Sequence, residues 1–233
     1  MGRLNGKVCM VTGGTSGIGR AICQEFVKEG AAVAALAILD GNSQKTVDEL
    51  NALGGRAFFV PMDVTSEEQW NSAKNAVKEK FGRIDVLVNC AGIFKEGKTT
   101  EVELGVFQKI MDVNVNGMFL GMKTCIPVMR EQGGGSIINI ASEAGIAAIP
   151  GQVAYNTSKA AAIMLTKSTA VDYALDHIRV NCICPGRVHT ELVQRILDSA
   201  EDYDAQYKLM SEDRPMMHMY SQRKACRTEL PKL

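Results

Sequence analysis

The chain of 233 residues lacks an excess of either charge, because 26 Lys and Arg balance 26 Asp and Glu. This balance argues against whole-protein attraction to nucleic acid or to an anionic membrane. No apolar run reaches the ~18 residues of a transmembrane helix, and the first residues lack the apolar core of a signal peptide. The seven cysteines are an odd number and form no metal-ligand pattern. We therefore expect a cytoplasmic protein with reduced thiols, no metal, and no nucleic-acid or membrane partner.

Two kinds of segment alternate along the chain. Short apolar runs predict strands at Val8–Thr12, Ala32–Leu39, Ala57–Asp63, Val86–Asn89, Ser136–Ile140 and Arg179–Ile183. Apolar residues at helical spacing predict helices at Arg20–Glu29, Ser43–Leu53, Ser66–Phe81, Glu103–Glu131 and Gln152–Asp176. Strands that alternate with helices indicate a parallel sheet with helices on both faces, because parallel strands need crossover connections. The predicted fold class is therefore α/β.

A glycine-rich segment directly follows the first predicted strand and precedes the first helix. Its glycines Gly13, Gly17 and Gly19 permit a sharp turn and a close approach of the backbone to a ligand. The helix that follows presents free N–H groups and a partial positive charge, which suit a pyrophosphate. This placement is typical of a dinucleotide site, and the alternative is a glycine-rich turn without a ligand.

The G-x-x-x-G-x-G spacing of this segment resembles the short-chain dehydrogenase/reductase family. Further motifs carry the resemblance in order over residues 1 to about 213: Asn89-Cys90-Ala91-Gly92, Asn114 to Gly117, Ser142, Tyr155-x-x-x-Lys159 and Pro185-Gly186-x-x-x-Thr190. The family has Asn where this chain has Cys90. The resemblance implies a Rossmann-type doubly wound parallel sheet with strand order 3-2-1-4-5-6.

The resemblance also implies which residues bind a nicotinamide dinucleotide. They are Gly13, Thr15, Ser16, Gly17, Ile18, Gly19, Asp63, Val64, Asn89, Ala91, Gly92, Tyr155, Lys159, Pro185, Gly186, Val188 and Thr190. In the family, an acid at the end of the second strand selects NAD, but Ala37 and then Ile38 stand at this position here. Asp40 follows three residues later, and no basic residue is placed to bind a 2′-phosphate. We therefore favour NAD over NADP.

Four residues are predicted to be catalytic: Asn114, Ser142, Tyr155 and Lys159. Tyr155 and Lys159 share one helix face, and a nearby ammonium favours the phenolate form that can exchange a proton with an alcohol. Ser142 follows an apolar strand, and its hydroxyl is predicted to hold the reacting oxygen. The resemblance further implies that Lys159 binds the nicotinamide ribose and that Asn114 supports a water relay.

The sequence thus predicts an NAD(P)-dependent oxidoreductase that interconverts a secondary alcohol and a ketone. The segments 121–124 and 133–139 resemble bacterial hydroxysteroid and alicyclic-alcohol dehydrogenases. One alternative is a 3-oxoacyl-carrier-protein reductase, which would need a basic patch for its acidic partner. An alternative of another class is a non-catalytic dinucleotide-binding scaffold or sensor. The intact set of four catalytic residues argues against this alternative, whereas the unusual C-terminus favours it.

The last part of the chain departs from the family pattern. From Arg214 onward, basic residues dominate and the apolar periodicity is lost. We expect one catalytic domain over residues 1–213 and a disordered tail over 214–233, without the family's seventh strand. Arg179–Ile183 would then be an edge strand. Since the resemblance implies that the missing segment builds one tetramer interface, we expect at most a homodimer through Glu103–Glu131 and Gln152–Asp176.

Overall fold

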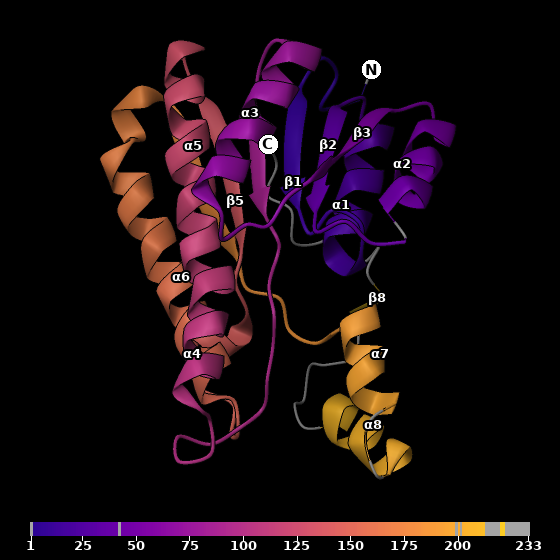
Figure 1. The fold of residues 1–233 in the computed structure, drawn as a ribbon, viewed down its shortest axis with the longest axis vertical. Helices are drawn as coiled ribbons and strands as arrows, with labels where there is room; N and C mark the ends of the chain where they lie inside the picture. The colour runs from indigo at the N-terminus through magenta and orange to yellow at the C-terminus, as the bar shows by residue number, and fades with distance from the viewer. Residues whose placement is uncertain (1, 42, 199, 201, 213–219, 222–233) are drawn as a thin grey trace.

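A parallel six-stranded sheet forms the centre of the computed structural model (Figure 1), which describes residues 2–41, 43–198, 200, 202–212 and 220–221. The strands are β1 (Val8–Thr12), β2 (Ala32–Ala37), β3 (Arg56–Pro61), β4 (Val86–Asn89), β5 (Gly135–Ile140) and β6 (Ile178–Ile183). Their order is β3-β2-β1-β4-β5-β6, and every pairing is parallel. The predicted fold class and strand order are confirmed. Within the described residues this sheet has no seventh strand, so β6 is an edge strand.

Helices cover both faces of the sheet. The helices are α1 (Gly17–Lys28), α2 (Ser43–Ala52), α3 (Glu67–Phe81), α4 (Leu104–Met111), α5 (Gly117–Glu131), α6 (Val153–Asp172), α7 (Glu191–Asp198) and α8 (Tyr203–Glu212). Buried side chains of α1 and α2 form one apolar core with one face of the sheet, and those of α3, α5 and α6 form a second core with the other face. None of the helices in the described part of the chain is long and apolar enough to cross a bilayer.

Two predicted strands are too long at their carboxyl ends. The structure ends β2 at Ala37 and β3 at Pro61, whereas the sequence patterns predicted ends at Leu39 and Asp63. Ala37 and Pro61 are the last pair in the register of these strands. The last bond of this ladder runs from the Met62 N–H to the Ala37 carbonyl oxygen at 2.8 Å, and beyond it the two strands no longer pair. Asp40 therefore lies beyond the end of the second strand.

The predicted continuous helix over Glu103–Glu131 is also wrong. A π-helical turn at Asp112–Asn116 separates α4 from α5. A π turn accommodates one residue more than an α turn, and such turns often occur at functional sites. Likewise, the predicted helix over Gln152–Asp176 ends at Asp172 and continues as a 3₁₀ turn at Ala174–Asp176.

A second, short pairing connects the segment after β6 with the C-terminal region. The strand β7 (Val188–His189) pairs in parallel with β8 (Tyr220–Ser221). The rest of the predicted tail falls on 214–219 and 222–233, which lie outside the described residues.

Candidate active site

A cavity of about 310 Å³ lies at the carboxyl ends of β1, β4, β5 and β6. The loops that follow these strands supply much of its lining, and residues of α1, α6 and α7 contribute to the remainder. Figure 1 shows α7 and α8 beyond this end of the sheet. Open parallel sheets bind their ligands in this position, because the loops after neighbouring strands diverge there.

The glycine-rich loop forms one wall of the cavity. Gly13 has a φ of +64°, and a Cβ on Gly19 would lie 2.2 Å from the Gly13 carbonyl oxygen, so a larger residue cannot replace Gly19 without moving the loop. The loop leads into α1, whose first N–H, that of Gly17, donates to the Glu191 carboxylate at 2.9 Å. An anionic oxygen thus already occupies the position at the helix N-terminus that suits a pyrophosphate.

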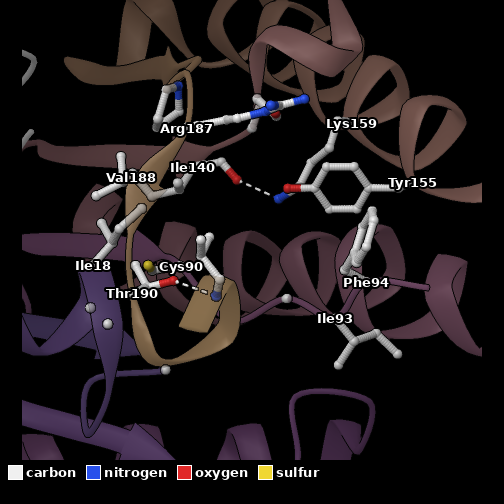
Figure 2. A pocket seen from close by; sticks show the side chains of 18 of the residues that line it. Ile18, Cys90, Ile93, Phe94, Ile140, Tyr155, Lys159, Arg187, Val188 and Thr190 are labelled. Carbon is white, nitrogen blue, oxygen red and sulfur yellow. Dashed lines mark hydrogen bonds between the residues drawn. The ribbon is translucent and has the colours of Figure 1, made fainter. Parts of the chain in front are cut away.

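Tyr155 and Lys159 project from α6 into the same cavity (Figure 2). Lys159 is buried, and its Nζ donates to the Ile140 carbonyl oxygen at 2.9 Å. The same Nζ lies 5.5 Å from the centroid of the Tyr155 ring. Phe94 contacts the phenol ring edge-on, with centroids 5.2 Å apart and an interplanar angle of 84°. These contacts hold the phenol in one orientation beside an ammonium group.

Ser142 lies directly after β5 and lines the cavity. Its Oγ accepts a hydrogen bond from the Ala144 N–H at 3.2 Å, which fixes the side chain. A serine hydroxyl that accepts in this way can still donate its own hydrogen. The structure therefore brings Ser142, Tyr155 and Lys159 together with the glycine loop, as the sequence patterns suggested.

Asn114 occupies the π turn and lies behind the cavity wall. Its amide accepts from the Ile93 N–H at 2.8 Å and donates to the Ile93 carbonyl oxygen and to Ser158 Oγ, both at 3.0 Å. A Cβ on Gly92 would lie 3.3 Å from Asn114 Oδ1 and 3.7 Å from Lys159 Nζ, so Gly92 lies between the two side chains. Asn114 thus supports the loop after β4, while the water relay stays a prediction.

The predicted dinucleotide residues divide into two groups. The cavity lining includes Gly13, Ser16, Gly17, Ile18, Gly19, Ala91, Gly92, Tyr155, Lys159, Pro185, Gly186, Val188 and Thr190. It does not include Thr15, Asp63, Val64 or Asn89. The second group makes contacts within the fold: for example, Asp63 Oδ1 accepts from Thr65, and Asn89 Nδ2 donates to Asn139.

Several lining residues were missed by the sequence analysis. Phe94, Gln152, Arg187 and Glu191 all contribute to the cavity wall. The only signal for them was position, because Phe94 follows the motif at Asn89–Gly92 and Glu191 follows Thr190. Thr12 was also missed: its Oγ1 accepts from the N–H groups of Cys90 and Ala91 and so anchors the loop after β4.

Cys90 replaces the second Asn of the family motif and lines the cavity. Burial raises the pKa of its thiol to about 11, although the nearby Lys159 ammonium opposes this shift. The thiol therefore stays protonated at neutral pH, and its weak donor contributes no charge to the site.

The end of β2 marks the place where a dinucleotide ribose would lie in a sheet of this topology. Ala37 is the last residue of β2, and Ile38 and Leu39 after it are exposed by 70% and 71%. Asp40 accepts a hydrogen bond from Ser43 Oγ at 2.8 Å, next to the start of α2. Two exposed apolar side chains therefore precede the nearest carboxylate.

These residues fit a nicotinamide dinucleotide. The loop needs glycine where a side chain would clash, the N-terminus of α1 already holds an anionic oxygen, and the catalytic side chains line the same cavity. Tyr155, Lys159 and the segment Pro185–Thr190 would hold the nicotinamide half.

Comparison with known proteins agrees with this geometry. The sequence model of the family described as short chain dehydrogenase matches residues 7–201. The 2-(R)-hydroxypropyl-CoM dehydrogenase of Xanthobacter autotrophicus is 45% identical over 84% of this chain and 80% of its own length. The cyclopentanol dehydrogenase of Comamonas testosteroni is 37% identical over 86% of this chain and 80% of its own length. The crystal structure of levodione reductase superposes with a TM-score of 0.92 at 29% identity, over 96% of this chain and 89% of that chain.

Proposed function

Because the chain belongs to the short-chain dehydrogenase/reductase family, and is thus an oxidoreductase acting on CH–OH groups with NAD or NADP, we propose that it interconverts a secondary alicyclic alcohol and its ketone. A steroid alcohol is included in this class. The observation that carries the proposal is the position of Ser142, Tyr155 and Lys159 in one cavity with the glycine loop.

The chemistry follows from the positions of these side chains. When bound, the nicotinamide ring supplies the hydride acceptor for the carbinol carbon. Tyr155 Oη takes the proton of the alcohol in the oxidation and returns it to the carbonyl oxygen in the reduction. Ser142 Oγ donates to the same oxygen and stabilises its developing negative charge. The buried Lys159 ammonium lies 5.5 Å from the centroid of the phenol ring and so places a positive charge beside the group that exchanges the proton.

The apolar part of the lining supports an alicyclic substrate. Ile93, Phe94, Ile149 and Val193 are apolar residues of the lining, and the Phe94 ring contacts the Tyr155 ring. Such walls bind a hydrocarbon ring by removing its surface from water. The hydroxyl groups of Ser142 and Tyr155 select for an oxygen substituent on that ring. The relative from Comamonas is named as a cyclopentanol dehydrogenase, which supports the same class.

The alternatives from the sequence have less support. A carrier-protein reductase would need a basic mouth, but the described lining residues carry two cations, Lys159 and Arg187, against two carboxylates, Glu143 and Glu191. A non-catalytic scaffold or sensor would not need Ser142, Tyr155 and Lys159 in one cavity. We therefore retain both only as outcomes of the experiment below.

We propose NAD as the cofactor. A 2′-phosphate on the ribose needs a cationic partner. The residues after β2 are the exposed and uncharged Ile38 and Leu39, which cannot supply this cation. The end of β2 offers no carboxylate for the 2′-hydroxyl either, so we expect a moderate preference for NAD over NADP.

We also propose a homodimer in the cytoplasm. Exposed apolar side chains occur on α5 and α6, at Phe119, Met164 and Val171, and a second copy would remove them from water. No disulfide joins any of the six cysteines that the structure describes, which is consistent with a reducing compartment.

The function is tested by oxidation of a panel of alicyclic and steroid alcohols with NAD and with NADP. Turnover of cyclic secondary alcohols, with NAD preferred, is the expected result. Activity on a 3-oxoacyl thioester alone would favour the reductase alternative. Tight dinucleotide binding without turnover of any alcohol or ketone would favour the scaffold.

A further inference from the structure

We propose that the protein has a second ligand site, for a small molecule that carries a phosphate group. This site lies at the amino ends of the strands, at the end of the sheet opposite the active site. A cavity of about 380 Å³ lies there. Its lining includes Lys7 before β1, Asp85 before β4, Ser136 in β5 and Arg179 in β6. Because all strands run in the same direction, their amino ends meet at this end of the sheet. The lining of the candidate active site comes from the other end, where Figure 1 shows α7.

The cavity is strongly basic. Four cationic residues contribute to its lining: Arg3, Lys7, Arg83 and Arg179. Asp85 is the one carboxylate among the described lining residues, and Glu29 outside the cavity pairs with Arg3. Two carboxylates against four cations leave a formal charge of +2 around the cavity, which a phosphate monoester dianion would balance.

Asp85 organises the cations rather than closing the cavity. Its carboxylate accepts from the Val8 N–H at 2.9 Å and from Arg83 Nε and Nη2 at 2.8 and 2.6 Å, and it lies 3.5 Å from Lys7 Nζ. Burial would raise the pKa of Asp85, but the hydrogen bonds from Arg83 and Val8 outweigh this effect and hold the pKa below its usual value. The side chains of Lys7 and Arg83 remain 50% and 47% exposed, so both can still reach an anion.

A buried hydroxyl provides an observation that is independent of the charges. Ser136 is only 5% exposed and contributes to the lining, yet its Oγ has no hydrogen-bond partner among the described residues. Buried hydroxyl groups almost always have a partner. The Ser136 Oγ is itself buried, so it lies just behind the cavity wall as a hydrogen-bonding group that no described residue uses. Ser136 pairs with Arg179 in the register of β5 and β6, which brings a donor and a cation together.

The size of the cavity indicates an organic ligand. A volume of about 380 Å³ exceeds that of an inorganic phosphate and falls within the range of small-molecule sites. Leu4 and Val86 add apolar surface beside the cations. We therefore commit to a phosphorylated metabolite, with the phosphate at Arg179 and Ser136 and the organic part against the apolar side chains.

The test is a calorimetric titration of the full chain with inorganic phosphate and with ribose 5-phosphate, at low ionic strength and with the dinucleotide bound. Both probes are expected to bind, and ribose 5-phosphate more tightly. Arg179→Gln removes an exposed cation without touching the core, and we expect it to weaken binding at least about fivefold, as for a charge-assisted hydrogen bond. Ser136→Ala is expected to weaken binding about two- to threefold, as for a neutral donor.

Arg56→Gln is the matched control. Arg56 is the first residue of β3, at the same end of the sheet as the cavity. It is exposed and does not line the cavity. Binding within about twofold of wild type is expected for this variant, because Arg56 does not line the cavity and therefore makes no direct charge-assisted hydrogen bond to the phosphate. An equal loss in the Arg56 and Arg179 variants would overturn the proposal in favour of non-specific charge. Binding only in the absence of dinucleotide would place the phosphate at the glycine loop instead, and no binding at about 10 mM of either probe would also overturn it.

Discussion

The carboxylate of Glu191 accepts a hydrogen bond from the backbone N–H of Gly17, with 2.9 Å between Oε2 and the nitrogen. Gly17 begins α1 and Glu191 begins α7. The contact therefore connects the helix N-terminus that suits a pyrophosphate with α7, which also lines the cavity. A carboxylate and a pyrophosphate oxygen cannot occupy this N–H together. Glu191 must therefore leave Gly17 before a dinucleotide can bind there.

Glu191→Gln is accordingly expected to tighten dinucleotide binding. The neutral amide competes less well for the N–H groups and the positive end of the helix dipole, so we expect an increase in affinity of about three- to tenfold. Fluorescence titration with NADH measures it. Asp198→Asn is the control, because it removes one charge from the same helix at a residue that bonds to Gln194. Equal gains in both variants, or weaker binding of the Glu191 variant, would contradict the competition.

Tyr155→Phe is expected to reduce turnover by about 10²- to 10⁴-fold, the usual contribution of general acid–base catalysis. The phenyl ring can keep the edge-on contact with Phe94, so dinucleotide affinity should change little. Steady-state kinetics and a separate binding titration check both statements. The control is Tyr173→Phe, since Tyr173 lies outside the cavity lining. Near wild-type turnover in the Tyr155 variant would remove the tyrosine from the mechanism.

Ala37→Asp is expected to raise the preference for NAD over NADP. The new carboxylate would end β2, where it can accept from the ribose 2′-hydroxyl and repel a 2′-phosphate. The ratio of the two dissociation constants is the measurement. Asp40→Asn serves as the comparison, because Asp40 lies beyond the strand and bonds to Ser43. If the Asp40 variant shifts this ratio and the Ala37 variant does not, Asp40 is the residue that binds the ribose 2′-hydroxyl.

Asp85→Asn is expected to lower the free energy of unfolding at neutral pH by about 1–3 kcal/mol, because it breaks a buried charge-assisted pair with Arg83. Since the pKa of Asp85 is lowered in the folded protein, its stabilisation is fully present above the unfolded carboxyl pKa of about 3.9. It is lost as the pH falls through the lower folded pKa. Thermal melts should therefore show a constant difference between variant and wild type above about pH 5 and a narrowing one below about pH 4. A constant difference at all pH values would mean that Asp85 stabilises by packing alone.

The proposed homodimer predicts that Met164→Glu produces a monomer. Met164 is 59% exposed on α6, and a carboxylate there would be buried unpaired in a dimer interface. Light scattering coupled to size exclusion gives the mass. Leu53→Glu, which follows α2 on the other face of the sheet, should leave the dimer intact. A wild-type tetramer, or a dimer that tolerates the Met164 variant, would refute this interface.

The sequence by itself determined the topology and predicted three side chains that share the candidate active site, Ser142, Tyr155 and Lys159. Apolar runs that alternate with helical periodicity leave few arrangements open, and all-parallel pairing follows from the crossovers. The glycine loop and the pair Tyr155 and Lys159 could be predicted from local sequence. A strand–turn–helix junction and an i,i+4 spacing each determine the relative positions of residues that are close in the chain.

Only the tertiary structure decided which distant residues meet. Glu191 and Gly17 are 174 positions apart in the sequence, yet they share a hydrogen bond. Phe94, in the loop after β4, contacts Tyr155 on α6. Hydrogen bonds to the Ile93 backbone hold Asn114 in the π turn, and β2 ends where its register with the neighbouring β3 ends, at Ala37 and Pro61. The four cations opposite the active site come from three segments of the sequence, before β1, before β4 and within β6. They gather because these strands belong to one parallel sheet. Such contacts have no local signal, since they arise from the packing of the whole sheet rather than from the spacing of residues along the chain.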